Sequence, residues 1–336
     1  MKIAVFSTKK YDKEFFENYN KDGNVNLTYF EVALKEQTAN LTQGFDGICT
    51  FVNDKLDKKT LETIHSNGIK LILLRCAGFN NVDLKVAEDL GLKIYRVPAY
   101  SPHAVAEHAL ALILTLNRKT HKAYNRVREG NFSLERLRGF DLYKKTVGVI
   151  GTGKIGSAFC SIMLGMGCKI LAHDAYENED LKEKGVVYVS KNELLEQSDI
   201  VSLHCPLTDD TFHLMNEESI QKLKKGAMVI NTSRGALINT LDILEALKDG
   251  RVGYLGIDVY EQEEKLFFND LSESIIKDDT IMRLISFPNV LITSHQGFFT
   301  NEALKQITNV TLSNIQTYLN GTSTENEVSY SLMHKA

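Results

Sequence analysis

The sequence predicts an α/β protein built on two doubly wound parallel sheets, and two observations support this prediction. Short apolar runs alternate with helical segments along nearly the whole chain of 336 residues, and such alternation is typical of parallel sheets covered by helices on both faces. One apolar run is followed directly by the pattern Gly151-x-Gly153-x-x-Gly156, which is typical of the strand–turn–helix unit of nucleotide-binding sheets. The length also allows two domains.

The segment around these glycines contains each part of a dinucleotide-binding unit. Thr146–Ile150 is a β-branched apolar run of the kind that forms a buried strand. A helix is expected to follow the glycines and to end near Gly165, and Lys169–Ala172 is expected to form a second strand that leads to Asp174. The order is therefore strand, glycine turn, helix, strand, acid.

Each part of this unit has a physical task in binding a dinucleotide. Gly151 permits the tight turn, Gly153 lets the backbone approach a pyrophosphate, and Gly156 lets helix and strand pack closely. Free N–H groups at the helix start attract the phosphates. Asp174 would accept hydrogen bonds from the ribose hydroxyls, and no arginine follows it to bind a 2′-phosphate, so NAD is favoured over NADP. The alternative for an isolated glycine pattern is an ordinary turn.

The composition excludes several classes of function. A formal net charge of −4, with 43% apolar and 24% charged residues, gives neither the basic footprint of a nucleic-acid binder nor a polybasic membrane patch. The longest apolar run, 109–116, is far shorter than a membrane span. Five cysteines are scattered without CxxC spacing, as expected of reduced thiols in a cytoplasmic protein without a structural zinc site or other metal.

The first hundred residues form one alternating pattern and are expected to fold as a separate small domain with a parallel sheet. The expected strands are 2–6, 25–30, 47–51, 69–74 and 92–97, and the expected helices are 12–19, 56–66 and 83–89.

A long helix is expected to begin after Ser101, with Pro102 at its first position, and to continue to about Gly130. Its first half is apolar and must be buried. We interpret it as the connection between the domains, with part of its apolar surface facing a second subunit. The alternative is an ordinary core helix within one domain.

Beyond Asp174 the alternation resumes and completes a second doubly wound sheet. The expected strands are 200–204, 228–231, 253–258 and 290–293, and the expected helices are 191–196, 216–222 and 241–247. A last helix, 301–319, should return to the first domain and leave a short polar tail, while 265–287 is an insertion without an assigned role. Polar residues follow these strands, where ligands bind in such sheets.

Seven motifs in order give the chain a family resemblance. They are RCAGFNNVDL (75–84), VPAYSP (97–102), GTGKIG (151–156), HCPLT (204–208), NTSRGALI (231–238), IDVYEQE (257–263) and SHQGF (294–298). Together they resemble the D-isomer specific 2-hydroxyacid dehydrogenases, and within that family the fermentative D-lactate dehydrogenases. The resemblance implies a Rossmann NAD-binding domain, 101–298 with the linking helix, inserted into a flavodoxin-like substrate domain, 1–100 plus 299–336.

The resemblance also implies the residues that perform catalysis. The family's arginine matches Arg234, and a guanidinium can hold a carboxylate and hydrogen-bond the adjacent carbonyl oxygen. Its histidine matches His295, and its carboxylate matches Glu263, which would orient the imidazole and favour its charged form. For the three residues the alternatives are a surface ion pair, a structural histidine and a solvated acidic loop, because Glu261 and Glu264 crowd the same loop.

Further positions are implied in the same way. The substrate is expected to be bordered by Ala77, Gly78, Tyr100, Arg234 and Phe298. The cofactor is expected to contact Gly151, Gly153, Lys154, Ile155, Gly156, Asp174, Cys205, Pro206, Thr211, Thr232, Ser233, Arg234 and Asp258. The family often has asparagine at the Thr211 position and small aliphatic residues at the Cys205 position, so these two matches depart from its pattern.

The activity implied by the resemblance is the reversible reduction of pyruvate to D-lactate by NADH, in a homodimer or dimer-based homotetramer. A larger 2-oxo acid, 2-oxoisocaproate or phenylpyruvate, is the alternative substrate. A non-catalytic alternative is an NAD-sensing protein on the same fold, because fold does not fix function. The sequence predicts no nucleic-acid or membrane partner.

Overall fold

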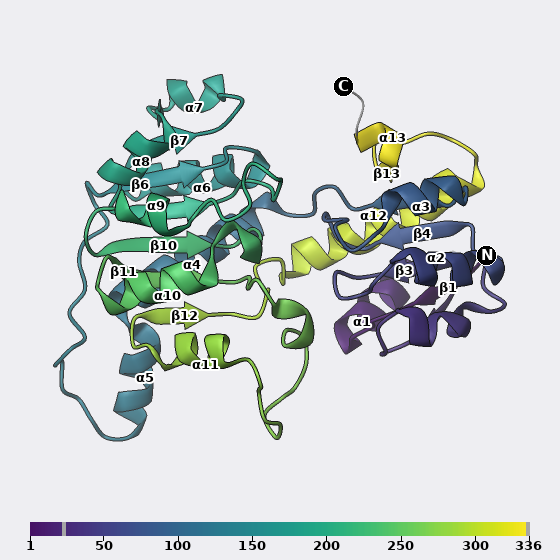
Figure 1. Ribbon diagram of the computed structural model, residues 1–336, viewed down its shortest axis with the longest axis horizontal. Helices are drawn as coiled ribbons and strands as arrows, with labels where there is room; N and C mark the ends of the chain where they lie inside the picture. The colour runs from purple at the N-terminus through teal and green to yellow at the C-terminus, as the bar shows by residue number, and fades with distance from the viewer. Residues whose placement is uncertain (22–24, 334–336) are drawn as a thin grey trace. The chain divides into compact units, whose positions relative to one another are not determined.

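The computed structural model describes residues 1–21 and 25–333 and divides into two compact units (Figure 1). The first unit combines Met1–Ser101 with Phe299–Ala336, and the second is the intervening segment Pro102–Phe298. The second unit is therefore a continuous insertion between the two parts of the first. Each unit has its own sheet and its own hydrophobic core.

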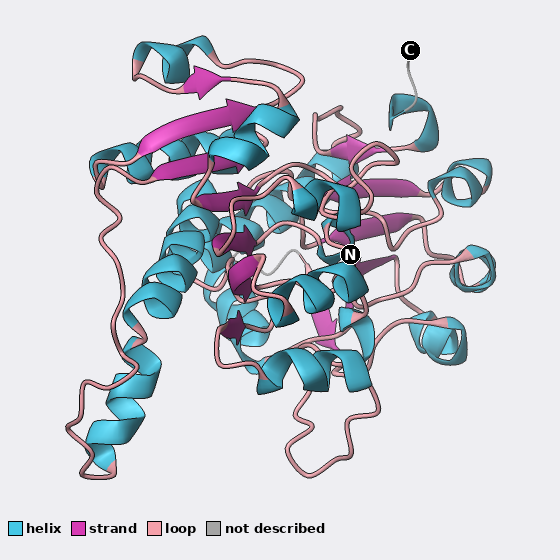
Figure 2. Ribbon diagram, turned by 60° about the vertical axis from the view of Figure 1, so that its left-hand side comes forward, coloured by secondary structure: helices cyan, strands magenta, loops and turns pink. Residues whose placement is uncertain are grey.

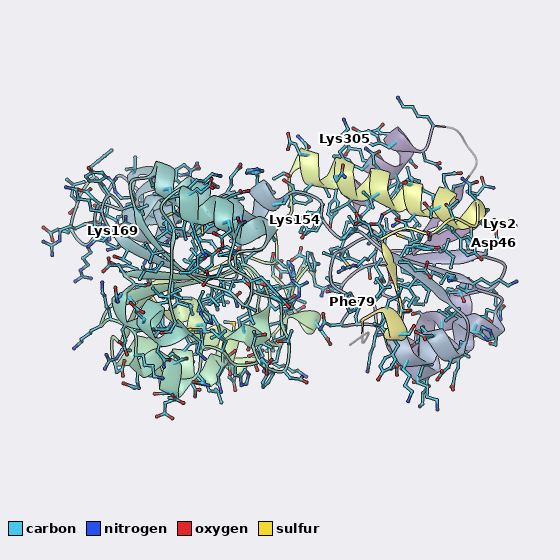
Figure 3. The ribbon with its side chains drawn as sticks, turned by 90° about the horizontal axis from the view of Figure 1, so that it is seen from above. Lys2, Asp46, Phe79, Lys154, Lys169 and Lys305 are labelled. Atoms are coloured by element: carbon cyan, nitrogen blue, oxygen red, sulfur yellow. The ribbon has the colours of Figure 1, made fainter. Side chains whose placement is uncertain are left out.

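The first unit contains a sheet with the strand order β13-β5-β4-β3-β1-β2. Its strands are β1 (Lys2–Val5), β2 (Asn26–Tyr29), β3 (Gly47–Thr50), β4 (Leu71–Leu74), β5 (Lys93–Arg96) and β13 (Glu327–Val328). β1 to β5 pair in parallel in the flavodoxin-like order 2-1-3-4-5, whereas β13 pairs antiparallel with β5. Lys2 and Asp46, labelled in Figure 3, join the amino ends of β1 and β3, because Lys2 N donates to Asp46 Oδ2 over 2.6 Å.

Helices flank this sheet, as Figure 2 shows in cyan beside the magenta strands. They are α1 (Lys10–Tyr19), α2 (Lys58–Ser66), α3 (Leu84–Asp89), α12 (Asn301–Leu319), α13 (Tyr330–Met333) and the 3₁₀ helix η1 (Glu36–Thr42). One buried cluster includes Ile64 of α2 and Ala87 of α3, and the other includes Phe16 of α1 and Ile315 of α12. The two clusters agree with a parallel sheet that is covered on both faces.

The second unit contains a parallel sheet with the order β12-β11-β10-β9-β6-β7-β8. Its strands are β6 (Thr146–Ile150), β7 (Lys169–His173), β8 (Val187–Tyr188), β9 (Ile200–Leu203), β10 (Ala227–Asn231), β11 (Val252–Ile257) and β12 (Val290–Ile292). Numbered within the unit, the order 3-2-1-4-5-6 with one added edge strand is that of a Rossmann sheet. The strand order reverses between β6 and β9, which places the ligand crevice outside their carboxyl ends.

In the second unit two helices precede β6, and the others lie between consecutive strands. The helices are α4 (Pro102–Arg118), α5 (Thr120–Arg128), α6 (Lys154–Gly165), α7 (Glu179–Glu183), α8 (Lys191–Gln197), α9 (Glu217–Gln221), α10 (Thr240–Lys248) and α11 (Asp279–Ser286), with 3₁₀ helices η2 (Gly235–Leu237) and η3 (Glu263–Lys265). The predicted α/β fold class with two doubly wound sheets is confirmed. Each predicted strand and helix outside 101–130 lies within two residues of its observed bounds.

The prediction of one helix from Pro102 to about Gly130 was wrong. The helix begins at Pro102 but stops at Arg118, and Lys119, with φ of 50°, separates it from α5. The segment that returns from α5 explains the break, because Phe140 N donates to Asn117 Oδ1 and Asn117 Nδ2 donates to Phe140 O. α4 packs against α6, β10 and β11 within the second unit, as the alternative of a core helix requires. α5 has no buried residues and extends away from that sheet (Figures 1 and 2).

Two further segments carry more structure than the sequence indicated. The expected polar tail contains β13 and α13, and Lys93 Nζ donates to Glu327 Oε1 over 2.7 Å beside the β5–β13 pair. The unassigned insertion 265–287 contains α11, whose Ile281 and Leu284 are buried in the core of the second unit. Within residues 1–21 and 25–333, no helix is long and apolar enough to cross a membrane.

Candidate active site and cofactor site

The glycine turn after β6 leaves no room for side chains at two of its three glycines. Gly151 has φ of 92°, and a Cβ there would lie 2.4 Å from Cys205 N. A Cβ on Gly156 would lie 1.9 Å from Gly151 O, so the first turn of α6 packs on the turn itself. Gly153 is the N-cap of α6 and has no atom within 4 Å of its Cβ position. The turn therefore presents open space at a helix N-terminus, as a pyrophosphate requires.

Asp174, at the end of β7, is fixed by the same turn. Its Oδ2 accepts hydrogen bonds from Thr152 N over 2.5 Å and Thr152 Oγ1 over 3.1 Å, and its Oδ1 accepts from Tyr176 N over 3.0 Å. Burial opposes ionisation, but these hydrogen bonds hold the pKa of Asp174 below its ordinary value. The carboxylate is therefore charged and oriented at the position expected for ribose recognition.

The loops after β9 and β10 meet beside the glycine turn. Ser233 Oγ donates to Cys205 O over 2.7 Å, which joins the two loops. Thr211 Oγ1 donates to Pro206 O over 2.7 Å and accepts from Thr208 N over 2.8 Å, so this hydroxyl closes its own loop. Thr232 Oγ1 is buried and has no hydrogen-bond partner in the part of the chain that the structure describes.

Asp258, only 1% exposed after β11, holds the loop that follows β12. Its Oδ1 accepts from Thr293 Oγ1 over 2.5 Å and Gln296 N over 2.8 Å, and its Oδ2 accepts from Gly297 N over 2.8 Å. His295 N donates to Asp258 O over 2.7 Å. Burial opposes ionisation, but hydrogen bonds from His108 and Thr293 keep the pKa of Asp258 low. The backbone of His295 is thereby fixed, although its φ of 54° is unusual for a residue other than glycine.

Glu263 contacts His295, as the sequence predicts. Glu263 Oε1 lies 2.8 Å from His295 Nδ1, and both side chains are about one fifth exposed. Glu263 Oε2 accepts from Tyr260 N over 2.9 Å, so both carboxylate oxygens are oriented. Glu263 engages Nδ1, which leaves Nε2 as the ring nitrogen available for proton exchange with a ligand.

Arg234 lies after β10, between the glycine turn and the histidine–glutamate pair in strand order. Its Nη1 donates to Ser233 O over 2.7 Å. Among the described residues of its own unit, no carboxylate lies within ion-pair distance of the guanidinium. A Cβ on the next residue, Gly235, would lie 2.2 Å from Tyr260 C. The Arg234 loop thus touches the loop of Glu263 directly, backbone against backbone.

The structure places the predicted substrate residues in different units. Phe298, 7% exposed, ends the second unit. Ala77, Gly78 and Tyr100 belong to the first unit, where Ala77 O accepts from Arg96 Nη1 over 2.9 Å and Gly78 O accepts from Cys76 Sγ over 3.3 Å.

Three residues of the second unit that sequence reasoning did not select also hold the site. His108 Nε2 lies 3.0 Å from Thr293 Oγ1 and 3.3 Å from Asp258 Oδ1. Tyr260 OH donates to Asp278 Oδ2 over 2.9 Å, and His213 Nε2 lies 2.7 Å from Glu261 Oε1. The only sequence signal for Tyr260 and His213 was their position close to the strand-end motifs. Their hydrogen-bonding partners are distant in sequence, so no local pattern predicts these contacts.

A model of a protein family matches residues 110–297 of the chain. The family domain is described as D-isomer specific 2-hydroxyacid dehydrogenase, NAD binding domain. The match spans the glycine turn, Asp174 and the three strand-end side chains Arg234, Glu263 and His295.

Individual relatives match nearly the whole chain. D-lactate dehydrogenase of Escherichia coli is 50% identical over 328 residues, which cover 98% of this chain and 100% of the relative. The solved apo-structure of D-lactate dehydrogenase from Escherichia coli matches with a TM-score of 0.90, covering 98% of this chain and 100% of that chain at 48% identity. D-lactate dehydrogenase from Aquifex aeolicus, solved in complex with NAD and lactic acid, matches with a TM-score of 0.85 at 36% identity, covering 95% and 96% of the two chains.

Proposed function

From the premise that the chain belongs to the D-isomer specific 2-hydroxyacid dehydrogenase family, we propose that it reduces pyruvate to D-lactate with NADH and catalyses the reverse oxidation. The observation that best supports this activity is the 2.8 Å contact between His295 Nδ1 and Glu263 Oε1 beside the Arg234 loop. An acid–base group and a cation are the two groups that reduction of a 2-oxo acid needs from the protein. The relatives named D-lactate dehydrogenase at about half identity favour pyruvate over a larger 2-oxo acid.

The second unit fits NAD, the cofactor of the family domain. The open N-terminus of α6 at Gly153 would hold the pyrophosphate, and the carboxylate of Asp174 would accept the ribose hydroxyls. The buried hydroxyl of Thr232 has no hydrogen-bond partner among the described residues, so it is open to a hydrogen bond with a bound cofactor. Reduced cofactor bound there supplies the hydride, while the chain supplies position, charge and the proton.

His295 would donate its proton from Nε2 to the substrate's carbonyl oxygen, which gains negative charge as C2 is reduced. Arg234 would hold the substrate carboxylate and stabilise the developing oxyanion, since no protein carboxylate neutralises its guanidinium within its unit. Glu263 would keep the imidazole oriented through its contact with Nδ1. Positions Lys154, Ile155, Cys205, Pro206, Thr211, Ser233 and Asp258 would border the cofactor.

We assign the first unit to the substrate. The backbone at Ala77 and Gly78 would border the substrate, and Tyr100 would limit the size of its side chain. Phe298, the last residue of the second unit, would limit it as well. Tyr11 packs edge-on against Phe299 with ring centroids 4.8 Å apart, which fixes one further bulky wall in this unit.

We further propose a homodimer or a dimer-based homotetramer in the cytoplasm, without nucleic-acid or membrane partners. Exposed apolar side chains in and after α5 support the assembly: Tyr124, Val127, Phe132 and Leu134. The five cysteines are buried free thiols, as suits a reducing compartment.

A panel of 2-oxo acids with NADH tests the activity. We expect kcat/KM for pyruvate to exceed those for 2-oxoisocaproate and phenylpyruvate by more than about tenfold, because steric discrimination of this kind is worth roughly 1–3 kcal/mol. Chiral chromatography of the product should give D-lactate. Faster turnover of phenylpyruvate would move the assignment to a larger substrate within the family, and no turnover of any 2-oxo acid would favour an NAD-sensing protein.

A further inference from the structure

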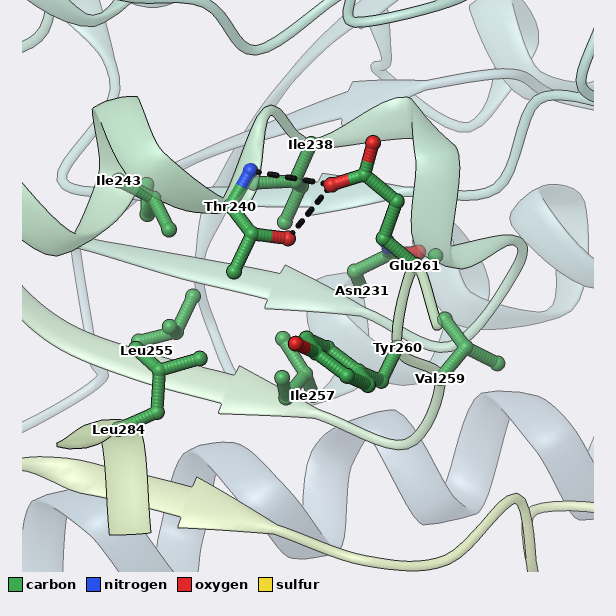
Figure 4. A pocket seen from close by; sticks show the side chains of 11 residues that line it. Asn231, Ile238, Thr240, Ile243, Leu255, Ile257, Val259, Tyr260, Glu261 and Leu284 are labelled. Atoms are coloured by element: carbon green, nitrogen blue, oxygen red, sulfur yellow. Dashed lines mark hydrogen bonds between the residues drawn. The ribbon is translucent and has the colours of Figure 1, made fainter. Parts of the chain in front are cut away.

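The second unit contains another histidine–carboxylate pair that the proposed chemistry does not use. His213 Nε2 lies 2.7 Å from Glu261 Oε1, and the two side chains are 25% and 20% exposed. The other carboxylate oxygen accepts from Thr240 Oγ1 over 2.7 Å and from Thr240 N over 3.4 Å, at the start of α10 (Figure 4). Both oxygens of Glu261 therefore have partners on two other elements.

His213 is held in place by its surroundings. Its φ of 49° lies in the left-handed region, which costs about 1–2 kcal/mol for a residue with a Cβ. Its N–H donates to Ala236 O over 2.9 Å, and Phe212 stacks on its ring with centroids 3.9 Å apart. A backbone conformation of this kind persists only where neighbouring contacts determine it, and such positions concentrate at functional sites.

The pair connects two loops with different tasks. His213 belongs to the loop 204–214, which follows β9 at the crevice where the strand order reverses. Glu261 is two residues before Glu263, and Tyr260 N between β11 and Glu261 donates to Glu263 Oε2. Gly235 contacts the same stretch, because its Cβ would lie 2.4 Å from Glu261 N. A displacement of either end of the pair must therefore move the backbone that orients Glu263.

We propose that His213 and Glu261 are positioning residues that couple the cofactor-bordering loop 204–214 to Glu263, so that Glu263 is aligned with His295 when the cofactor is bound. The proposal rests on the proposed function. A hydrogen-bonded histidine–carboxylate pair can transmit such a displacement, because both residues belong to short loops whose backbones are themselves hydrogen-bonded. His213 and Glu261 are not required to touch the cofactor or the substrate.

The test is a double-mutant cycle between His213→Gln and Glu263→Gln, followed by kcat for pyruvate and by the Kd of NADH. The sequence has no tryptophan, so NADH fluorescence reports binding without overlapping emission. We expect His213→Gln alone to lower kcat about tenfold and to raise the Kd about threefold or more. In the Glu263→Gln background it should change kcat less than twofold, because the residue through which the pair acts has already been disabled.

Equal tenfold losses of kcat in both backgrounds would overturn the proposal, as would a fall in the thermal midpoint with unchanged kcat and Kd. If His213→Gln does not fold, Glu261→Gln gives the same cycle, since it keeps the side-chain size and a bond to Thr240. Glu218→Gln is the matched control, because it removes an exposed ion pair between Glu218 on α9 and Lys222 just after that helix, and it should change neither quantity. If the wild-type chain reduces no 2-oxo acid, that result would instead contradict the proposed function. The Kd of NADH in His213→Gln would still show whether the pair acts on loop 204–214.

Discussion

Three glutamates on one loop, Glu261, Glu263 and Glu264, differ in role only through their contacts. Glu263 is bonded to His295 and to Tyr260 N, Glu261 is bonded to His213 and Thr240, and Glu264 is exposed. Sequence reasoning selected Glu263 by its resemblance to a family motif, and the contact with His295 supports that choice. It could not separate the other two, because the partner of Glu261 is 48 residues away in sequence.

Replacing Glu263 with Gln should lower kcat/KM for pyruvate reduction. The carboxylate orients the ring of His295 through Nδ1 over 2.8 Å, and an uncharged amide of the same size holds it less firmly, so we expect a loss of about tenfold or more, because hydrogen bonds to charged groups contribute about 1.5–3 kcal/mol. His295→Gln should lower the rate at every pH, because it removes the proton donor. Glu264→Gln serves as the control, and a loss of kcat/KM seen there rather than in Glu263→Gln would show that the carboxylate is misassigned.

Asp174→Ala should weaken NADH binding about tenfold and reduce the preference for NADH over NADPH. The change removes the ribose acceptor and the negative charge that would face a 2′-phosphate, and hydrogen bonds to a charged group contribute about 1.5–3 kcal/mol. Kd values for both cofactors provide the measurement. Asp180→Ala, which removes an exposed acid from α7 nearby in sequence, should leave the ratio unchanged; an unchanged ratio in Asp174→Ala would remove Asp174 from the cofactor site.

At the scale of helices and strands, the sequence predicted those elements whose bounds depend on residues close together in the chain. α12 has the predicted bounds Asn301–Leu319 because Thr300 caps it and its apolar spacing is regular. The break at Lys119 depends instead on residues of the returning segment, including a Cβ position on Gly139 only 2.5 Å from Asn117 O. β13 exists because it pairs with β5, a partner more than 200 residues earlier. Such long-range contacts leave no periodic signal in the sequence.

The contact between the strand-end loops is testable at Gly235. Gly235→Ala should lower kcat/KM about 100-fold, because its Cβ would meet the Tyr260 backbone at 2.2 Å and would separate Arg234 from the Glu263 loop, and misplacements near 1 Å have effects of that size. Steady-state kinetics measures the loss. Gly165→Ala, at the end of α6 with open space around its Cβ position, is the matched control and should retain activity, with up to about 1 kcal/mol of added stability. Equal activity in both variants would contradict the close contact.

At the scale of the whole molecule, the two units have separate cores, one around Ile48 and Ile72 and another around Val229 and Leu255. The insertion of one unit into the other was predicted from motif order, not from hydrophobic periodicity. Periodicity assigns a residue to a core, but it does not say which core, because both sheets use the same alternation of strand and helix. Unfolding is therefore expected to show one transition for each unit.

We expect His204 to make the unfolding free energy of the second unit depend on pH and to leave that of the first unit unaffected. Burial lowers its pKa to about 3, while an unfolded histidine has a pKa near 6.5. Its Nδ1 is buried without a partner among the described residues, and its Nε2 lies 2.8 Å from Ser202 Oγ. The imidazole is therefore neutral in the folded state. Below pH 6.5 the unfolded chain binds a proton at this histidine, and the folded chain does not. The stability contributed by this difference is fully present above pH 6.5 and is lost progressively as the pH falls from 6.5 toward 3.

Urea unfolding at pH 7 and pH 5 measures this loss. Between the two pH values His204 should remove about 1–2 kcal/mol from the unfolding free energy of the second unit. His204→Gln cannot titrate and still offers an amide to Ser202, so the variant should not lose this free energy. The unfolding free energy of the wild type relative to the variant should therefore fall by the same amount between pH 7 and pH 5. His65→Gln, which replaces an exposed histidine on α2 of the first unit, should leave the transition of the second unit unchanged at both pH values. Parallel losses in wild type and His204→Gln would show that the imidazole is protonated equally in the folded and unfolded states, and the acid sensitivity of the second unit would then belong to its carboxylates, Asp258 first among them.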